Sequence, residues 1–541
     1  MQRLSAFAIT AAILTTLSTG ATSRNAAGST APSAVPADIR AILGKPIYKH
    51  ATWGIRVLDG SKVLIDLHPQ KKFFIGSVRK VFSVGQLLDA VGAGHRYNTP
   101  VYRTGAVRGG VLHGNLVIVA SGDLTMGGRR NPDGSIAVSD WDHNEADSLG
   151  NAILTKPNPL AGYEQLARAV RAAGITRVDG DVVVDDRLFK PFDFRGEFNV
   201  RPIYVNDDVV DLSIVNAGGS VGSKTSVNYR PVSAALAIAN NLRNGAANSK
   251  ATYKVNPQYP KCIGTAGCAS AIDGSLPIGF TPPLTGGNTL VQTVRITQPS
   301  NYARTVFVES LRKAGVTVGA PTVKQNPTNL LPSRAAYTAS NRVALLQGMT
   351  YGQDAKLILK ISYNIGADTS IVLFGLTRGV NSMPAALAVE RKNLATRFGI
   401  APNEYYFVDG SGGGDTTATD HAVTQVLQEL QRRPAFPTLY ADLPILAVDG
   451  SLASVKDFEK DRTLAGAAGK IRAKTGTYVA GSPSGGPVLK GQAFGGYITT
   501  KSGKHLVYQL VVNNVPITSI ADVIGVFQDE GTISAMLWRD Y

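Results

Sequence analysis

The sequence predicts a mixed α/β protein in which one α/β domain is split by a long β-rich insertion. Strand patterns and an apolar helix pattern lie near the N-terminus, at residues 53–91. Short strand patterns dominate residues 97–339, and longer helices, strands and a closing helix follow from about residue 340. Because 541 residues exceed the usual size of one hydrophobic core, we expect about two to four domains.

The composition is that of an ordinary globular protein with a basic surface. Hydrophobic residues make up 44% of the chain and charged residues 17%, and 55 Lys and Arg against 39 Asp and Glu give a formal charge of +16. No dense basic run with interleaved aromatic residues indicates a nucleic-acid groove, so no nucleic-acid partner is expected. A spread positive charge favours an anionic envelope polymer or peripheral association with a membrane surface.

The N-terminus has the three parts of a secretory signal peptide. Arg3 supplies the positive region, residues 4–17 form a short apolar core, and residues 21–23 are small, as at a cleavage site. A buried helix of the folded domain is the alternative. We therefore predict a signal peptide at 1–23, a disordered leader at 24–44, and an exported protein in the periplasm or the extracellular cell-wall space.

The first half of the chain yields its elements in order. Residues 53–67 read as two strands around the Asp59-Gly60 turn, and a helix is expected from Ser77 to about residue 91. The segments "GGVLHGNLVIVASGD" and "GITRVDGDVVVDDRLF" read as short strands, with the helix "GYEQLARAVRAAG" between them. The polar segment 128–150 is expected to be a solvated loop, and its acidic residues fit no ion-binding spacing: Asp140, Asp142, Glu145 and Asp147.

Two cysteines, Cys262 and Cys268, lie in the next strand-and-loop section, residues 225–290. Export permits a disulfide, and the five residues between them can turn back tightly. Two free thiols are the alternative. No histidine lies nearby and two sulfurs do not complete a zinc site, so no metal is expected.

The second half predicts a helix and strand at 300–318, helices from about 340, the strands "GQAFGGYITT" and "HLVYQLVVNN", and a closing helix. Strands from both chain ends then share one split domain. The predicted domains are 45–96 with 340–541, an inserted domain at 97–224 with 291–339, and a nested domain at 225–290.

Ser77 and Lys80 stand one helical turn apart in "GSVRK". Taken alone, this spacing describes an ordinary helix start with an N-cap serine and two solvated basic residues. Histidine offers no convincing base, because none of the seven lies in a recognisable catalytic arrangement. The match to Gly-x-Ser-x-Gly at 218–222 is not followed by a helix pattern, so it lacks the context of a nucleophile elbow.

Three motifs in a fixed order change that interpretation. Ser-x-x-Lys at 77–80 is followed by Ser362-Tyr363-Asn364 and then by Lys-Thr-Gly at 474–476. This ordered set is the penicillin-recognising serine signature. A helix pattern after the first motif and a strand pattern at the third agree with it.

With these motifs the chain resembles the D-alanyl-D-alanine carboxypeptidase/endopeptidase family, the class C low-molecular-mass penicillin-binding proteins. Further segments carry the resemblance over roughly residues 45–530: "GGVLHGNLVIVASGDLT", "GITRVDGDVVVDDRLF", "VDGSG", "LPILAVDGSL", "AKTGT" and "LVVNN". It implies a split penicillin-binding/β-lactamase-like transpeptidase domain, with an antiparallel sheet between helices and two inserted domains between the first and second motifs.

Two segments depart from the family pattern. Ile75-Gly76 replaces the usual Pro-Ala before the nucleophile, and Gly413-Gly414-Asp415 replaces Leu-Ser-Arg after "DGSG". The second change alters the shape and charge of one wall of the site. The acid that usually follows the second motif is present as Asp368.

The resemblance assigns roles to the motif residues. Ser77 is the nucleophile, and Lys80 is its base, which requires lowering the lysine pKa by roughly 3 units from about 10.4. Asn364, with Tyr363 or Ser362, positions Lys80. Ser362 relays the proton to the departing D-Ala amine.

The third motif is expected to bind the substrate carboxylate through Lys474 with Thr475 or Thr477. The backbone N–H groups of Ser77 and Thr477 form the oxyanion hole. Gly476 completes this motif, and no cofactor is expected.

Asp185 and Phe189 match a family segment near the mouth of the site that helps to select the peptide side chain. An acid there can pair with the ammonium of diaminopimelate. The alternative is that Asp185 only caps a turn.

The predicted function is that of a serine-type D-Ala-D-Ala carboxypeptidase, DD-endopeptidase, or both, acting on peptidoglycan stem peptides and acylated by β-lactam antibiotics. A β-lactamase or esterase on the same fold is the main alternative, and the long insertion argues against it. A non-catalytic envelope-binding protein is the third, and the complete set of catalytic side chains argues against that.

Overall fold

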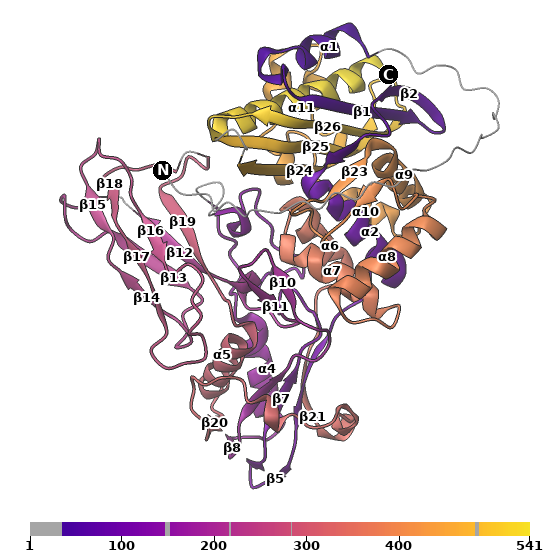
Figure 1. The fold of residues 1–541 in the computed structure, drawn as a ribbon. Coiled ribbons are helices and arrows are strands. Elements are labelled where there is room, and N and C mark those ends of the chain that lie inside the picture. Colours follow the sequence, from indigo (N-terminus) through magenta and orange to yellow (C-terminus); the bar gives the residue numbers. More distant parts are fainter. Residues whose placement is uncertain (1–34, 147–151, 216–217, 283, 482–485) are drawn as a thin grey trace, which may run out of the picture.

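The computed structural model describes residues 35–146, 152–215, 218–282, 284–481 and 486–541, and Figure 1 shows how their helices and strands are arranged. The predicted signal peptide, the first part of the predicted leader, and Asp147 lie outside the described residues. Among the described residues, no helix is both long enough and apolar enough to span a membrane.

Strands from both ends of the chain form one antiparallel sheet, as predicted. Its order is β2-β1-β26-β25-β24, so the N-terminal hairpin pairs directly with a C-terminal strand. The strands are β1 (Thr52–Asp59), β2 (Lys62–Leu67), β24 (Ile471–Gly481), β25 (Pro487–Thr499) and β26 (His505–Pro516). This pairing brings the chain ends together on one scaffold for the catalytic motifs.

Both faces of this sheet are covered by helices, which explains its alternating apolar residues. On β25, Ala493 and Tyr497 belong to one hydrophobic core, and Phe494 and Ile498 belong to the core on the opposite face. The terminal helix α11 (Ile520–Asp540) packs in the second core, and α2 (Lys80–Val91) packs in the first. Figure 1 shows the sheet between these helices, as the predicted fold class requires.

The predicted disordered leader is wrong at its C-terminal end. Residues Ala37–Leu43 form helix α1, in which Ile39 and Ile42 are buried in the same core as α11. Arg539 of α11 forms a 2.5 Å ion pair with Asp38. The Ala- and Pro-rich composition obscured this helix because only one apolar pair, spaced i and i+3, marks its buried face.

Further helices surround α2 and, with the five-stranded sheet, make up the part of the chain predicted as the DD-peptidase domain, which we call the peptidase region. They are α6 (Tyr351–Lys360), α7 (Asn364–Leu376), α8 (Met383–Arg397), α9 (Asp420–Gln431) and α10 (Phe436–Asp442). A small sheet, β22-β23-β3, lies beside them and comprises β3 (Lys72–Phe74), β22 (Tyr405–Tyr406) and β23 (Thr417–Thr419). Residues 80–88 of α2 are all buried, so the helix that follows Ser77 is fixed on every side.

The inserted region contains two four-stranded sheets and two helices, built from both of its ends. One sheet has the order β21-β4-β7-β9 and the other β20-β8-β6-β5. Their elements are β4 (Thr99–Arg103), β5 (Ala106–Arg108), β6 (Val111–His113), β7 (Leu116–Val119), α4 (Ala161–Ala172), β8 (Arg177–Val178), β9 (Val182–Asp185), α5 (Pro299–Lys313), β20 (Thr317–Val318) and β21 (Arg342–Leu346).

The remainder of the insertion consists of smaller sheets: β13-β12-β19, β14-β17-β16, β15-β18 and the hairpin β10-β11. These strands are β10 (Phe192–Phe194), β11 (Phe198–Val200), β12 (Val209–Val215), β13 (Ser226–Arg230), β14 (Ala237–Asn240), β15 (Arg243–Gly245), β16 (Lys254–Asn256), β17 (Ala269–Asp273), β18 (Ser275–Pro277) and β19 (Thr289–Arg295).

The domain boundaries stay predictions. Strand pairing crosses three of them, at about residues 225, 290 and 340. Strand β21 pairs with β4, so the chain is still in the inserted sheet after residue 340. Strands β13 and β19 flank β12, across the proposed limits of the nested domain. One hydrophobic core also includes residues of both proposed inserted domains.

The interpretation of segment 128–150 as a solvated loop is wrong for its central acid. Asp142 is buried and receives two 2.8 Å hydrogen bonds from Arg129. Asp140 accepts a 2.6 Å hydrogen bond from the backbone N–H of Gly450 in the peptidase region. Sequence composition could not reveal the partners that make burial of these charges possible.

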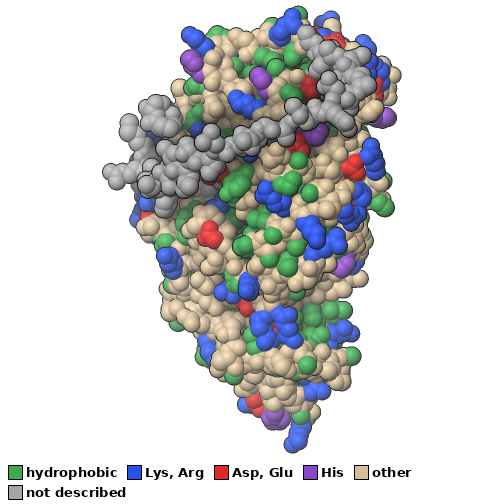
Figure 2. Space-filling model, turned by 45° about the vertical axis from the view of Figure 1, so that its right-hand side comes forward, with side chains coloured by type: hydrophobic (Ala, Val, Ile, Leu, Met, Phe, Trp, Pro, Cys, Tyr) green, Lys and Arg blue, Asp and Glu red, His purple; other side chains and the backbone are tan. Residues whose placement is uncertain are grey.

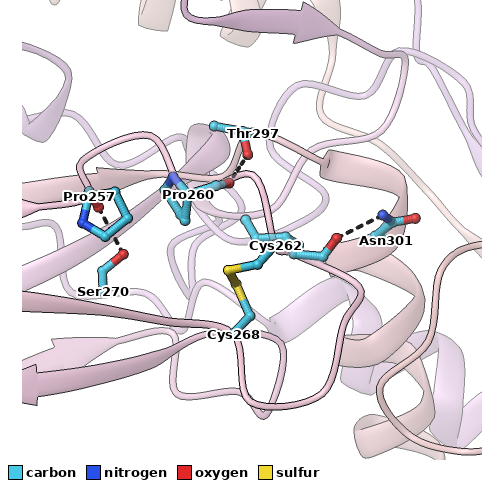
Figure 3. Close-up of a disulfide and its surroundings, with 8 residues drawn as sticks. Pro257, Pro260, Cys262, Cys268, Ser270, Thr297 and Asn301 are labelled. Carbon is cyan, nitrogen blue, oxygen red and sulfur yellow. Dashed lines mark hydrogen bonds between the residues drawn. A yellow bond between two sulfur atoms is a disulfide. The ribbon is translucent and has the colours of Figure 1, made fainter.

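Cys262 and Cys268 form the predicted disulfide, with Cα atoms 5.3 Å apart. Figure 3 shows that the bridge closes a turn next to α5, where Asn301 donates a 2.9 Å hydrogen bond to the carbonyl of Ile263. The bridge therefore belongs to the inserted region.

On the face drawn in Figure 2, the coloured Lys and Arg side chains are scattered among uncharged ones and form no continuous basic strip. This view agrees with the spread of charge along the sequence.

Candidate active site

Two chain segments, 75–77 and 476–477, approach each other closely at the backbone of Ser77. The residue lies in a short 3₁₀ turn, Gly76–Arg79, which leads into α2. Gly76 has φ +48°, and a Cβ there would lie 2.7 Å from the backbone nitrogen of Thr477. A Cβ on Gly476 would collide with the carbonyl of Ile75, so glycine is required on both sides of this approach. The backbone N–H groups of Ser77 and Thr477 therefore lie close to each other.

Lys80 lies at the centre of a hydrogen-bonded cluster. Its Nζ is 2.7 Å from Ser77 Oγ, 2.7 Å from Asn364 Oδ1 and 3.0 Å from the carbonyl oxygen of Ser411. The side chain is 0% exposed. The structure thus brings the first two motifs together, although they are far apart in the sequence.

The second motif occupies the turn between α6 and α7. Ser362 has φ +62°, an uncommon conformation for serine, and Asn364 is the first residue of α7. Tyr363 is buried, and its hydroxyl has no hydrogen-bond partner among the described atoms. Tyr363 was predicted, as an alternative to Ser362, to help Asn364 position Lys80. Its hydroxyl makes no hydrogen bond to Lys80.

The third motif lies on β24, next to the turn that carries Ser77. Lys474 is fully buried, and its Nζ donates a 2.9 Å hydrogen bond to the carbonyl of Thr475. The hydroxyl of Thr475 is 2.7 Å from that of Ser451, and exposed Thr477 donates a 3.2 Å hydrogen bond to Gln492 Oε1. Strand β24 thus contributes one buried cation and two hydroxyls.

A tight loop at 409–413 forms the wall behind Lys80. The carboxylate of Asp409 accepts backbone hydrogen bonds from Ser411 at 3.0 Å, Gly412 at 2.7 Å and Gly413 at 3.0 Å. Gly412 has φ +100°, and a Cβ there would collide with the carbonyl of Gly76. One of the two departures from the family pattern, Gly413-Gly414-Asp415, begins at the last residue of this loop.

Arg79 supports this loop from the side of Ser77. Its guanidinium is 0% exposed, donates to the carbonyl of Asp409 at 2.9 Å, and binds both carboxylate oxygens of Glu390 at 2.8 and 2.6 Å. The interpretation of residues 79 and 80 as solvated basic side chains is therefore wrong. The role of Arg79 was not predicted, because its partners lie more than 300 positions away in the sequence.

Asp409 of the loop and Asp368 beside it have pKa values shifted in opposite directions. Burial and the neighbouring Asp409 raise the pKa of Asp368 to about 7. Burial would also raise the pKa of Asp409, but Arg195 and the backbone N–H groups of the loop lower it below its usual value. Asp368 accepts a 2.9 Å hydrogen bond from the N–H of Gly410, which fixes the start of the loop.

A second loop, 449–451, connects the second and third motifs. Asp449 pairs with Lys360 of α6 at 2.6 Å, and a Cβ on Gly450 would lie 2.8 Å from the carbonyl of Lys360. Ser451 reaches Thr475, as described above. The sequence signal for this loop was the segment "LPILAVDGSL", which the motif analysis left without a role.

Asp185 and Phe189 lie in the insertion. The Asp185 side chain is 3% exposed, and its oxygens accept hydrogen bonds from Arg187 at 2.7 and 2.6 Å and from Tyr337 at 2.7 Å. These partners lower its pKa against the effect of burial. Phe189 is buried and lies near Phe192, with ring centroids 5.9 Å apart. The structure gives neither residue a hydrogen bond to the three motifs.

One cluster among the described residues has the geometry of a metal site. The ligand atoms of Asp142, His143 and Asp207 lie within 4.8 Å of one another. The Arg129 guanidinium is already among them, 2.8 Å from Asp142 and 2.7 Å from Asp207. Burial alone would lower the pKa of His143, but Asp211, Asp142 and Asp207 raise it to about 10. The cluster is thus an ion-pair network with its own cations.

Comparison with known proteins agrees with this geometry. Residues 35–524 match the family model described as the D-Ala-D-Ala carboxypeptidase 3 (S13) family. No curated protein sequence matches the chain.

Solved structures of low sequence identity match most of the chain, and those with a TM-score above 0.5 share its fold. Penicillin binding protein 4 from Haemophilus influenzae matches with a TM-score of 0.65 and 16% identity, over 93% of this chain and 99% of that one. The same protein complexed with a β-lactam matches with a TM-score of 0.62, again at 16% identity and the same coverage. A predatory peptidoglycan endopeptidase from Bdellovibrio bacteriovorus matches with a TM-score of 0.46 and 14% identity, over 90% of this chain and 92% of that one.

Proposed function

The chain belongs to the D-Ala-D-Ala carboxypeptidase 3 (S13) family, and we propose that Ser77 carries the acyl-enzyme chemistry of this serine DD-peptidase. The observation that carries the proposal is the position of Lys80 Nζ, 2.7 Å from both Ser77 Oγ and Asn364 Oδ1. An amine at this distance can accept the hydroxyl proton as the serine attacks a carbonyl carbon.

In the acylation step, Ser77 Oγ forms a bond to the carbonyl carbon of the penultimate D-Ala while its proton passes to Lys80. The carbonyl oxygen becomes an oxyanion and is bound by the N–H groups of Ser77 and Thr477. The C–N bond then breaks, and Ser362 relays a proton to the departing D-Ala amine. Water attacks the resulting ester, releases the shortened peptide, and restores the Ser77 hydroxyl.

Substrate binding follows from the charges of β24. Lys474, with the hydroxyls of Thr475 and Thr477, binds the terminal carboxylate of the peptide. β-Lactam antibiotics carry a comparable carboxylate and acylate the same serine. The β-lactam complex of the structurally similar Haemophilus protein supports this part of the proposal.

The natural substrate is the peptidoglycan stem peptide. Removal of terminal D-Ala is the carboxypeptidase reaction, and cleavage of a D-Ala-to-diaminopimelate cross-link is the endopeptidase reaction, which uses the same acyl-enzyme. Asp185 and Phe189 are proposed to select the peptide side chain. Such substrates lie outside the cytoplasm, which agrees with the predicted signal peptide at 1–23 and a periplasmic or cell-wall location.

The test is to incubate wild-type protein and Ser77→Ala with fluorescent penicillin and with cross-linked muropeptides. Wild-type protein should be labelled slowly and stably and should release D-Ala or separate cross-linked peptides. Ser77→Ala should lose labelling entirely and retain the wild-type unfolding temperature. Labelling of another serine in the variant would overturn the nucleophile assignment, and rapid turnover of the drug by the wild type would indicate a β-lactamase.

A further inference from the structure

The hairpin β10-β11 of the insertion reaches the loop that holds Lys80. Its turn carries Arg195, whose Nη2 donates a 3.1 Å hydrogen bond to Ser411 Oγ and lies 4.0 Å from the carboxylate of Asp409. In Figure 1 this hairpin lies between the inserted sheets and the helices of the peptidase region. It therefore forms a direct link between two parts of the molecule that are separate in sequence.

The contact has the marks of a built site. Arg195 has φ +52°, which is uncommon for a residue with a side chain, so the turn holds it in a restricted conformation. Its guanidinium carbon lies 5.2 Å from the centre of the Phe194 ring. A Cβ on Gly413 would lie 3.0 Å from Arg195 Nε, so the glycine found there leaves the room that the guanidinium occupies.

Hydrogen bonds connect Arg195 to Ser77 through two residues, Ser411 and Lys80. Ser411 receives Arg195 on its hydroxyl and Lys80 on its carbonyl, and Lys80 in turn contacts Ser77. Arg79 also holds this loop, through the carbonyl of Asp409. The loop is thus held by one buried arginine of the peptidase region and by one partly exposed arginine of the insertion.

We propose that Arg195 is a positioning residue for acylation, through which the inserted hairpin fixes loop 409–413 and so holds Lys80 against Ser77. This inference rests on the proposed function of Ser77 and Lys80. It also gives the insertion a role in the chemistry itself. Removal of Arg195 should slow acylation by about tenfold, the usual effect of losing a charge-assisted hydrogen bond.

The electrostatics of the loop agree with this role. Arg195 lowers the pKa of Asp409 and also acts to lower that of Asp368. The other charged groups facing these two acids are Arg79, Lys80 and Glu390. Without Arg195 both acids should bind protons at higher pH, and a protonated Asp409 is a weaker acceptor for the N–H groups of the loop.

The experiment measures the rate of acylation by fluorescent penicillin in full-length wild type, Arg195→Met, Arg195→Lys and Arg295→Met. The rate is followed from about pH 5 to about pH 9, because ordinary carboxyl and histidine pKa values lie at roughly 4 to 7. Arg295 is the matched control. Its guanidinium packs 5.7 Å from the rings of Phe194 and Phe198 and pairs with Glu197 at 3.0 Å, so its loss disturbs the same hairpin. No described contact joins it to Ser411.

Arg195→Met should acylate about tenfold more slowly, with the acid limb of its pH profile moved to higher pH. Arg195→Lys should recover part of the rate, and Arg295→Met should keep the wild-type rate and profile. An unchanged rate and profile in Arg195→Met would overturn the proposal while leaving the proposed function intact. Failure of the wild type to be labelled would instead reject the proposed function. If Arg195→Met does not fold, Arg195→Lys provides the test. A wild-type rate and pH profile in Arg195→Lys would count against a specific role of the guanidinium in positioning. A slower rate with a shifted acid limb would support that role.

Discussion

Two buried clusters, one around Lys80 and one around Arg129, differ in which groups their basic side chains contact. Lys80 directs three hydrogen bonds to uncharged oxygens, those of Ser77, Asn364 and Ser411. Arg129 lies between the carboxylates of Asp142 and Asp207. Both side chains are almost completely buried, so burial alone does not separate the two sites.

The difference lies in the reactions open to each cluster. An amine beside a hydroxyl can exchange a proton with it, and the serine oxygen can then attack a carbonyl. A guanidinium is never deprotonated in a protein, and carboxylates on two sides stabilise its charge further. The buried amine of Lys80 beside a serine hydroxyl therefore suits proton transfer, whereas the guanidinium of Arg129 between carboxylates cross-links the fold.

The largest expected effect is on the first cluster. Lys80→Met should lower the rate of penicillin acylation by roughly three orders of magnitude or more, because nucleophile and base act as a unit. The measurement is the single-turnover rate of labelling, with circular dichroism as a check on folding. A loss smaller than tenfold would mean that another group removes the serine proton.

The second cluster should respond in stability. Arg129→Met leaves the buried carboxylates of Asp142 and Asp207 with only His143 as a cation beside them, and should lower the free energy of unfolding by about 3–5 kcal/mol. Urea unfolding measures this change. Arg168→Met is the control, since its 3.9 Å contact with Glu164 is largely exposed and should contribute under about 0.5 kcal/mol. Equal stability of the two variants would contradict the structural role of Arg129.

The residues of the Lys80 cluster could be picked out of the sequence because they occur in short motifs. The spacing of Ser77 and Lys80 places both on one side of a helical turn, and the ordered second and third motifs supplied Asn364 and Lys474. The sheet was predictable for a similar reason, since alternating apolar strands occur at both chain ends.

The Arg129 cluster and the contacts of Arg195 were not predictable in this way. Asp142 and Asp207 are separated by a helix and several strands, and Arg195 meets Ser411 from a different part of the chain. No local period marks such pairs, so the acids at 128–150 resembled a solvated loop. Helix α1 was missed because its short apolar pattern becomes informative only once α11 packs beside it.

A smaller effect is expected where the insertion is cross-linked covalently. Replacing Cys262 and Cys268 together by serine should lower the free energy of unfolding by about 2 kcal/mol, because the bridge closes only a short loop in the unfolded chain. The rate of acylation by penicillin should stay within about twofold of the wild type, since the bridge contacts none of the three motifs. A twofold change corresponds to less than about 1 kcal/mol in activation free energy. A larger loss of acylation would show that this end of the insertion also supports the site.

The smallest expected effect concerns Asp185, whose carboxylate resembles the Arg129 cluster more than the Lys80 cluster. It is bound by Arg187 and Tyr337, so a diaminopimelate ammonium can reach it only by replacing or joining those partners. Arg187 is 36% exposed, which leaves its side of the ion pair open to exchange.

If that exchange occurs, Asp185→Ala should raise KM for diaminopimelate-containing peptides about two- to fivefold, in line with the modest free energy of a partly exposed ion pair. Penicillin lacks this side chain, so its acylation rate should stay unchanged. Tyr337→Phe is the matched variant, because it removes one hydrogen bond from the carboxylate and keeps its charge, and its KM should stay near that of the wild type. Equal losses for drug and peptide, or lower stability with an unchanged KM, would assign Asp185 to the fold of the insertion, because a recognition role requires a change confined to the peptide.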